Sequence, residues 1–162
     1  AILLGNRLPA LDRIGGGRVR VGSCSLMAPA CSMAFYSAHF RPRLGGATAP
    51  TLTPIDQMTI YSLGDTAEQA DTVTPLYNKS LLYLVSNAFE TASHLPLLGM
   101  EQFNRAIGGD PVELCFAEPS STRCNSTTHG GFDNDPATMN DILARVLKAP
   151  PAREFTSRDL DY

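Results

Sequence analysis

The sequence lacks several features that would place it at a membrane or on nucleic acid. No apolar run approaches the roughly 20 residues that a membrane-spanning helix needs, so no membrane span is expected. The chain does not open like a secretory signal, because Arg7 and Pro9 interrupt its short apolar start. Lysine and arginine, 13 of 162 residues, are scattered rather than clustered, and the net charge is −3. We therefore expect a cytoplasmic protein with no nucleic-acid partner.

Motifs for metal, calcium or phosphate binding are also missing. The sequence has four cysteines: Cys24, Cys31, Cys115 and Cys124. None belongs to a C-x-x-C pair, which argues against zinc. Residues 133–135 lack the remaining ligands of a calcium loop, and no Lys-Ser/Thr follows Gly108-Gly109 as in a phosphate loop. We expect no metal and no cofactor, and interpret the cysteines other than Cys124 as buried thiols in apolar surroundings.

The residues that are present form an ordinary globular mixture, with 43% hydrophobic and 18% charged residues. Three short, mostly apolar runs bounded by loop residues predict buried strands. They cover residues 21–30, 58–63 and 112–118. Apolar side chains at helical spacing predict helices before, between and after these strands. They cover residues 2–11, 33–40 and 75–90, and a last helix begins at Asp135-Pro136, with its apolar face formed by Met139, Ile142, Leu143, Val146 and Leu147.

The alternation of strands and helices predicts an α/β fold, a parallel sheet with flanking helices. Residues 1–148 would form this domain, with loops at 41–56 and 64–73. Residues 149–162, which are polar and contain two prolines, would form an extended tail. Three strands are few for a buried parallel sheet, and the first helix begins without a cap. We therefore expect the C-terminal part of a larger domain, or one chain of a split domain.

Titratable side chains follow the second and third predicted strands. Asp65, Glu68 and Asp71 come after the second strand, and His129 lies in the loop after the third. The carboxyl ends of parallel strands share one sheet edge, where ligands and catalytic groups gather. A carboxylate that accepts a hydrogen bond from an imidazole fixes its tautomer, and the other ring nitrogen can then take a proton from a nucleophile. The alternative is a loop histidine that caps the turn at Asp135.

Two short motifs at this edge resemble the α/β-hydrolase family. Residues 71–75 (DTVTP) resemble the D-x-V-x-P ending of its acid loop, and residues 129–132 (HGGF) resemble its histidine loop. The order of the predicted strands and helices also resembles that family, so that the resemblance covers about residues 1–147. It implies His129 as the base and Asp71 as the acid of a Ser-Asp-His triad. Asp71 stands eight residues after Leu63, later than is usual, so Asp65, and also Glu68, remain rivals for the acid.

The nucleophile that this family uses has no counterpart in the sequence. No G-x-S-x-G occurs, and the nearest match, residues 22–25 (GSCS), lies inside a predicted strand. By the family's order, the nucleophile would precede the helix at 2–11, so we expect it upstream of residue 1, together with the oxyanion-hole donors. Cys31, at the end of the first strand, offers an alternative dyad with His129. A caspase-like order is excluded, because His129 follows Cys31 by 98 residues.

The resemblance implies a serine hydrolase segment that supplies the acid and the histidine. Its substrate would be a small acyl compound: an ester, a thioester or an amide. The expected partner is an N-terminal fragment or a second copy of the chain. The alternative function is a non-catalytic α/β module that binds a partner.

Overall fold

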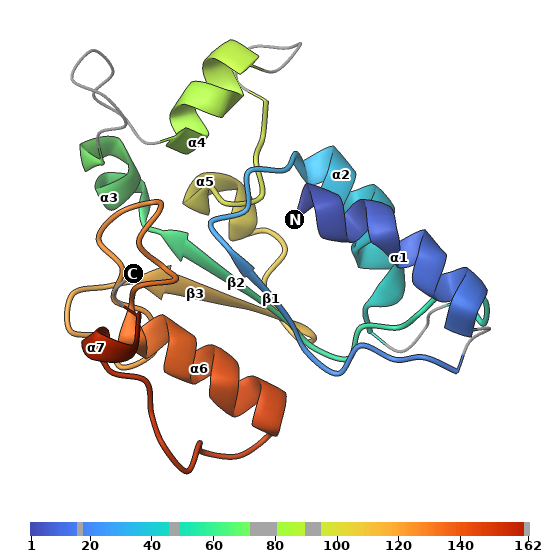
Figure 1. Cartoon of the computed structure of the whole chain (residues 1–162). Coiled ribbons are helices and arrows are strands. Elements are labelled where there is room, and N and C mark those ends of the chain that lie inside the picture. Colours follow the sequence, from blue (N-terminus) through green and yellow to red (C-terminus); the bar gives the residue numbers. More distant parts are fainter. Residues whose placement is uncertain (16–17, 46–48, 72–80, 90–94, 161–162) are drawn as a thin grey trace.

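The computed structural model describes five stretches of the chain: residues 1–15, 18–45, 49–71, 81–89 and 95–160. Within them, three strands form one parallel sheet in the order β1-β2-β3 (Figure 1). The strands are β1 (Cys24–Met27), β2 (Met58–Leu63) and β3 (Val112–Ala117). The predicted α/β class, a parallel sheet with flanking helices, is confirmed at this level, and β2 has the predicted bounds.

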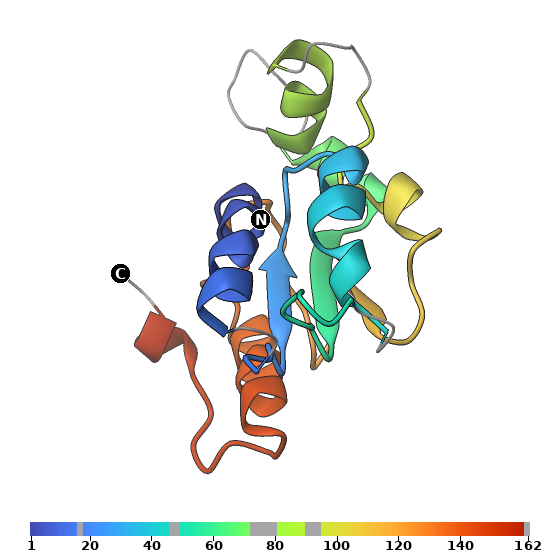
Figure 2. The same cartoon turned by 90° about the vertical axis from the view of Figure 1, so that its right-hand side faces the viewer.

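The helices flank the sheet and extend past its ends. They are α1 (Ile2–Gly15), α2 (Met33–His39), α3 (Asp65–Ala70), α4 (Leu81–Leu84), α5 (Glu101–Asn104), α6 (Pro136–Leu147) and α7 (Ser157–Leu160), with a 3-10 turn η1 (Arg41–Arg43) and a π-helical turn η2 (Val85–Phe89). Helices α1 and α2 lie on one side of the sheet and α6 on the other (Figure 1). Helices α3 and α4 lie toward the carboxyl ends of the strands (Figure 2).

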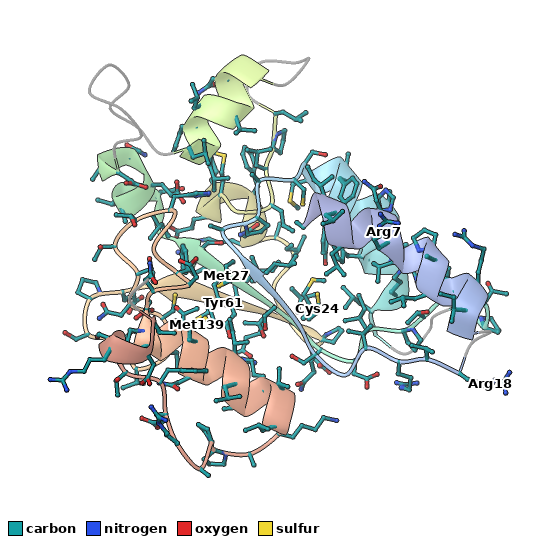
Figure 3. The ribbon with its side chains drawn as sticks, in the orientation of Figure 1. Arg7, Arg18, Cys24, Met27, Tyr61 and Met139 are labelled. Atoms are coloured by element: carbon teal, nitrogen blue, oxygen red, sulfur yellow. The ribbon has the colours of Figure 1, made fainter. Side chains whose placement is uncertain are left out.

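The two faces of the sheet pack into two separate cores. In the central strand, Met58 and Ile60 belong to a cluster with Leu8 of α1 and Tyr36 of α2. The alternate residues Tyr61 and Leu63 belong to a second cluster, against which Ile142 of α6 packs. All six residues of β2 are buried because both faces are covered, and this explains its continuous apolar sequence. Tyr61, labelled in Figure 3, also donates a hydrogen bond of 2.6 Å to Asp141 of α6.

Helix α6 begins as predicted but buries less of its apolar face than expected. Asp135 accepts hydrogen bonds from the backbone N–H groups of Ala137 and Thr138, and Pro136 occupies the first turn. Val146 and Leu147, predicted to face the core, are 61% and 52% exposed. Helical spacing predicts which residues share a face, but not how much of that face other elements cover.

Four other predictions differ from the structure in local detail. Residues 65–70, expected as a polar loop, form α3, and α1 runs to Gly15 through Pro9. Of the predicted helix at 75–90, residues 81–89 form α4 and η2, and residues 75–80 lie outside the described part. The tail contains a helical turn, α7, whose Leu160 is buried. Short helices of this kind are decided by local hydrogen bonds and packing, which apolar spacing does not detect.

Candidate functional site

The site lies where β2 and β3 end. Strand β2 passes through Gly64 into α3, which places Asp65 and Glu68 three residues apart and hence on neighbouring positions of one helix surface. Strand β3 leads into the loop of residues 118–135, which carries His129 and runs beside α3 (Figure 1). The shared sheet edge therefore brings a carboxylate and an imidazole together, as the strand order predicts.

Glu68 is the carboxylate closest to the His129 ring. Its Oε1 lies 3.7 Å from Nδ1 of His129, and the two side chains are 1% and 14% exposed. Neither oxygen of Glu68 nor Nδ1 of His129 has a hydrogen-bond partner among the described residues. A separation of 3.7 Å is longer than a hydrogen bond. Catalytic hydrogen bonds are often long in structures without substrate and tighten when the complex forms.

Asp71, the acid suggested by the family resemblance, contacts the histidine loop through its backbone. Its Oδ2 accepts a hydrogen bond of 2.8 Å from the N–H of His129. This bond fixes the start of the His129-Gly130 segment relative to the end of α3, but it does not reach the ring. Asp71 therefore positions the histidine residue, whereas Glu68 faces its imidazole.

Asp65 stands at the beginning of α3. Its backbone N–H donates a hydrogen bond of 2.7 Å to Oε2 of Glu101, so that Glu101 caps a helix whose N-cap residue, Gly64, has no side chain. Burial and the nearby carboxylates of Glu101 and Glu68 raise the pKa of Asp65. Within the described ranges, no hydrogen bond or ion pair joins Asp65 to His129.

The loop around His129 is held by its own polar groups. Asp135 accepts a hydrogen bond of 2.7 Å from the N–H of Asn125 while it caps α6. A Cβ atom at Gly131 would lie 2.7 Å from Oγ1 of Thr128, so a side chain there would require the Thr128 side chain to move. The loop is therefore tightly packed at Gly131. The alternative in which His129 caps the Asp135 turn does not occur, because Asp135 bonds to backbone N–H groups and to Thr138.

In the part of the chain that the structure describes, no nucleophile accompanies the histidine. Within the described ranges, no hydroxyl or thiol group hydrogen-bonds to the His129 ring. Cys31, the alternative nucleophile, is 1% exposed in the core on the α1–α2 side of the sheet, and burial raises the pKa of its thiol. Ser25 is a half-buried residue inside β1, and its hydroxyl oxygen is buried. The structure therefore does not form the Cys31–His129 dyad.

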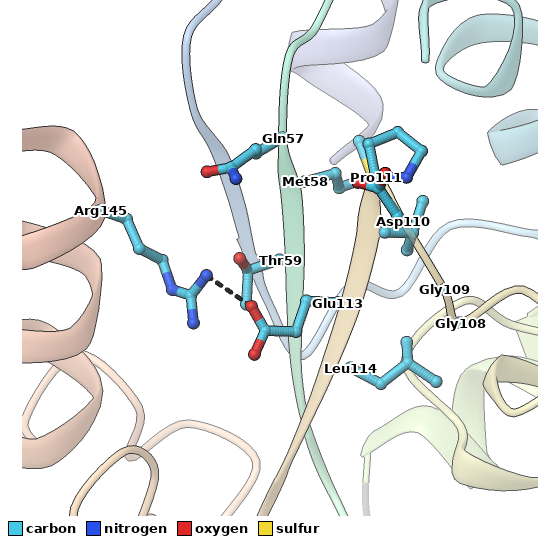
Figure 4. A pocket seen from close by; sticks show the side chains of 11 residues that line it. Gln57, Met58, Thr59, Gly108, Gly109, Asp110, Pro111, Glu113, Leu114 and Arg145 are labelled. Carbon is cyan, nitrogen blue, oxygen red and sulfur yellow. Dashed lines mark hydrogen bonds and ion pairs between the residues drawn. The ribbon is translucent and has the colours of Figure 1, made fainter. Parts of the chain in front are cut away.

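A hollow at the opposite edge of the sheet contains an ion pair. It has a volume of about 420 Å³ and lies at the amino ends of β2 and β3, lined by residues that include Thr59, Glu113 and Arg145 (Figure 4). Arg145 donates to Glu113 at 2.6 Å and to Asp141 at 2.7 Å. The pair with Glu113 attaches α6 to β3, and the pair with Asp141 lies within α6. The charges of Arg145 and Glu113 are therefore already paired with each other.

Sequence reasoning placed Glu68 only among the rivals for the acid. The signal that favours it is the run Ala67-Glu68-Gln69-Ala70, whose residues all have good helix propensity. A helix at this point turns Glu68 back toward the strand end, whereas an extended loop would carry Asp71 toward the ring. Recognising α3 would therefore have favoured Glu68.

Comparisons with protein-family models, with curated proteins and with solved structures found no match. In the described residues, no helix has both the length and the apolar character to cross a membrane. The same residues contain no group of three or more histidine, cysteine, aspartate or glutamate side chains arranged to hold a metal ion. Any functional assignment consequently rests on the residues and geometry of this chain.

Proposed function

We propose that this chain is the C-terminal catalytic segment of a serine hydrolase of the α/β-hydrolase type. The observation that carries the proposal is the buried Glu68–His129 pair beyond the carboxyl ends of a parallel sheet. A buried carboxylate without a hydrogen-bond partner costs free energy. Such a cost is typical of functional sites, where the group is held ready for a bond made during the reaction.

In this proposal, His129 acts as general base and then as general acid. The Glu68 carboxylate accepts a hydrogen bond from the protonated Nδ1 of His129 and thereby fixes the tautomer of the ring. Nε2 is then free to take the proton of a nucleophilic hydroxyl. Asp71 holds the backbone of His129 in place. The hydroxyl attacks the carbonyl of a small ester, thioester or amide, His129 protonates the leaving group, and water then releases the acid. The assignments of Asp71 and Asp65 as the acid remain predictions.

The nucleophile and the oxyanion-hole donors would come from residues outside this chain. Two features support this arrangement. No described hydroxyl bonds to His129, and β1 has no strand on its outer side within the described ranges. A parallel strand added there would end at the same sheet edge as Glu68 and His129, where a strand-to-helix turn could present a serine.

The test is hydrolysis of a generic ester by the protein expressed with the coding sequence that precedes Ala1. His129→Ala is expected to lower kcat/KM by at least ~10³. His39→Ala serves as the matched control and should leave the rate unchanged, because His39 belongs to α2. Activity within about tenfold of wild type for His129→Ala would remove the base assignment. No hydrolysis by the longer wild-type protein would favour the non-catalytic binding module.

A further inference from the structure

Glu101 supplies the cap that α3 lacks at its own N-terminus. The N-cap residue of α3 is Gly64, which has no side chain to accept a backbone N–H. The N–H of the first helical residue, Asp65, donates instead to Oε2 of Glu101 at 2.7 Å. Glu101 belongs to α5, so a residue of one helix caps another. A carboxylate suits this position because a helix N-terminus carries partial positive charge.

Helix α5 is itself attached to the strand that leads into α3. The side-chain amide of Asn104 donates to Oγ of Ser62 in β2 at 3.2 Å, and both side chains are fully buried. Asn104 follows Glu101 by three residues, which places the two side chains on neighbouring positions of one helix surface. Oε1 of Glu101 accepts a hydrogen bond from Arg105. Through these contacts, α5 holds the chain on both sides of Gly64.

The capped turn carries the backbone of Glu68. The N–H of Glu68 donates to the carbonyl oxygen of Gly64 at 2.9 Å, which is the first hydrogen bond within α3. Helix α3 has only 6 residues, so its first turn depends on contacts with other elements. Oε1 of Glu68 lies 3.7 Å from Nδ1 of His129. A displacement of this turn would therefore move the Glu68 carboxylate relative to the ring.

We propose that Glu101 is a positioning residue, which holds the first turn of α3 and thereby keeps the Glu68 carboxylate at Nδ1 of His129. In the described part of the chain, neither member of the Glu68–His129 pair bonds directly to Glu101. The effect on catalysis rests on the proposed function, in which Glu68 orients His129. The placement of Glu68 at the ring can be measured on this chain without a reaction.

Three variants separate the cap from its charge. Glu101→Gln removes the charge but keeps an oxygen that can accept the N–H of Asp65, whereas Glu101→Ala removes both. The third variant adds Gly64→Ser to Glu101→Ala, because a serine hydroxyl at the N-cap accepts a backbone N–H of the first turn. A Cβ atom at Gly64 would have only Oε2 of Glu101 as a close neighbour, at 3.3 Å. Gln102→Ala, at an exposed position of α5, is the control.

The first readout is the tautomer of the His129 ring in this chain, determined from the NMR shifts of its two nitrogens at about pH 9. A neighbouring acceptor decides which ring nitrogen carries the proton, so the wild type is expected to carry it on Nδ1. Glu68→Gln and Glu101→Ala should both lower the ratio of Nδ1–H to Nε2–H by at least about threefold. Glu101→Gln, the serine-capped variant and Gln102→Ala should keep the wild-type ratio.

The second readout is hydrolysis of a generic ester by the protein expressed with the coding sequence that precedes Ala1. Glu101→Ala should lower kcat by at least about tenfold and leave KM within about twofold, because the cap acts on the base and not on substrate binding. Glu101→Gln and the serine-capped variant should both have a kcat within about threefold of wild type.

The proposal is overturned if Glu101→Ala leaves the tautomer ratio unchanged, or if Glu101→Gln lowers the ratio as far as Glu101→Ala does. If Glu101→Ala does not fold, Glu101→Asp, whose oxygens are drawn back by one methylene, is measured in its place with the same expectation. A ratio that Glu68→Gln leaves unchanged would overturn both the positioning role and the Glu68–His129 pair. The expected ratios without hydrolysis by the longer wild-type protein would support the positioning role and remove only the hydrolase assignment.

Discussion

Glu68 is a buried side chain whose two carboxylate oxygens lack hydrogen-bond partners in the described part of the chain. Such a group lowers stability, because a carboxylate taken out of water must recover its lost hydration through partners. Its Oε1 lies 3.7 Å from Nδ1 of His129. At the scale of single residues, this pair links a cost in folding free energy to a proposed role in catalysis.

Three isosteric variants can distinguish the roles of Glu68, Asp71 and Asp65. They are made in the protein expressed with the coding sequence that precedes Ala1. Glu68→Gln is expected to lower kcat/KM most, by at least ~10², because the amide no longer favours the required tautomer. Asp71→Asn should lower it less, since the amide oxygen still accepts the N–H of His129. Asp65→Asn should have the smallest effect. The largest loss at Asp71 or at Asp65 would instead support the acid assignments drawn from the family resemblance.

The cost of burying Glu68 predicts a stability change that is measurable on this chain alone. Glu68→Gln removes the buried charge and is expected to raise the free energy of unfolding by about 1 kcal/mol. Glu118→Gln changes an exposed carboxylate and serves as the control, with no expected change. Urea unfolding at neutral pH provides the measurement. A loss of stability in Glu68→Gln would mean that the carboxylate already makes a favourable bond in the free protein.

Asp12 and Arg43 form a partly buried ion pair that should contribute to the loss of stability in acid. Arg43 is 5% exposed and donates two hydrogen bonds, of 2.6 and 2.7 Å, to the Asp12 carboxylate, which also accepts the N–H of Thr53. The bond from Arg43 is the main reason that the pKa of Asp12 lies well below its usual range. Asp12→Asn leaves a buried guanidinium without its counterion and should cost about 3–5 kcal/mol.

The pH dependence has a defined sign. Because the folded state lowers the pKa of Asp12, its contribution to stability is complete above the unfolded pKa of about 4 and declines as the pH falls below it. Unfolding by urea at about pH 7 and about pH 3 should therefore show a larger loss for wild type than for Asp12→Asn. Asp133→Asn, at an exposed position, is the control. Equal losses in wild type and Asp12→Asn would contradict this account.

At the scale of elements, the N-terminus of α6 connects the helix to the histidine loop. One carboxylate, that of Asp135, caps α6 and also accepts the N–H of Asn125, four residues before His129. The cap and the loop therefore form one hydrogen-bonded unit. The same unit includes Thr138, whose hydroxyl donates to Asp135 at 2.6 Å.

Asp135→Ala should therefore destabilise both α6 and the loop. The expected loss in unfolding free energy is about 2 kcal/mol, the upper end for an N-cap, and amide hydrogen exchange should increase over residues 125–138. Ser32→Ala removes the simpler cap of α2, a single bond from Phe35 N–H. It should cost about 1 kcal/mol without changing exchange in the histidine loop. Unchanged exchange at 125–138 in Asp135→Ala would show that the loop is held independently of the cap.

At the scale of the whole molecule, the sheet has two edges without a neighbouring strand within the described ranges. Large apolar side chains are also exposed on α1: Leu3 is 75% exposed and Ile14 82%. On α4, Leu81 is 38% exposed, whereas Leu82 is fully buried. Exposed apolar surface and open strand edges both favour association.

The purified chain is accordingly expected to self-associate. Light scattering after size-exclusion chromatography should give a mass above that of the monomer, increasing with concentration. Replacing Leu3 and Ile14 together by glutamate should shift the chain toward the monomer. Replacing the exposed Arg18 and Arg153 by glutamate is the control for added negative charge. A monodisperse monomer at all concentrations would contradict the expected need for a covering partner.

The sequence by itself determined the alternation of strands and helices, the bounds of β2, and the start of α6 at Asp135-Pro136. Each of these depends on residues close together in the chain: an apolar run, a capping carboxylate, a proline. The parallel arrangement followed as well, since strands separated by helices return in the same direction. These local and topological rules also placed His129 and the acidic residues at one edge of the sheet.

Only the tertiary structure decided which acid meets the ring of His129. The distance between Glu68 and the imidazole depends on how α3 and the loop of residues 118–135 pack, and these segments are far apart in the sequence. A short helix in place of a loop was enough to exchange Asp71 for Glu68 at the ring. The exposure of Val146 likewise follows from packing across the sheet, which residue spacing does not encode.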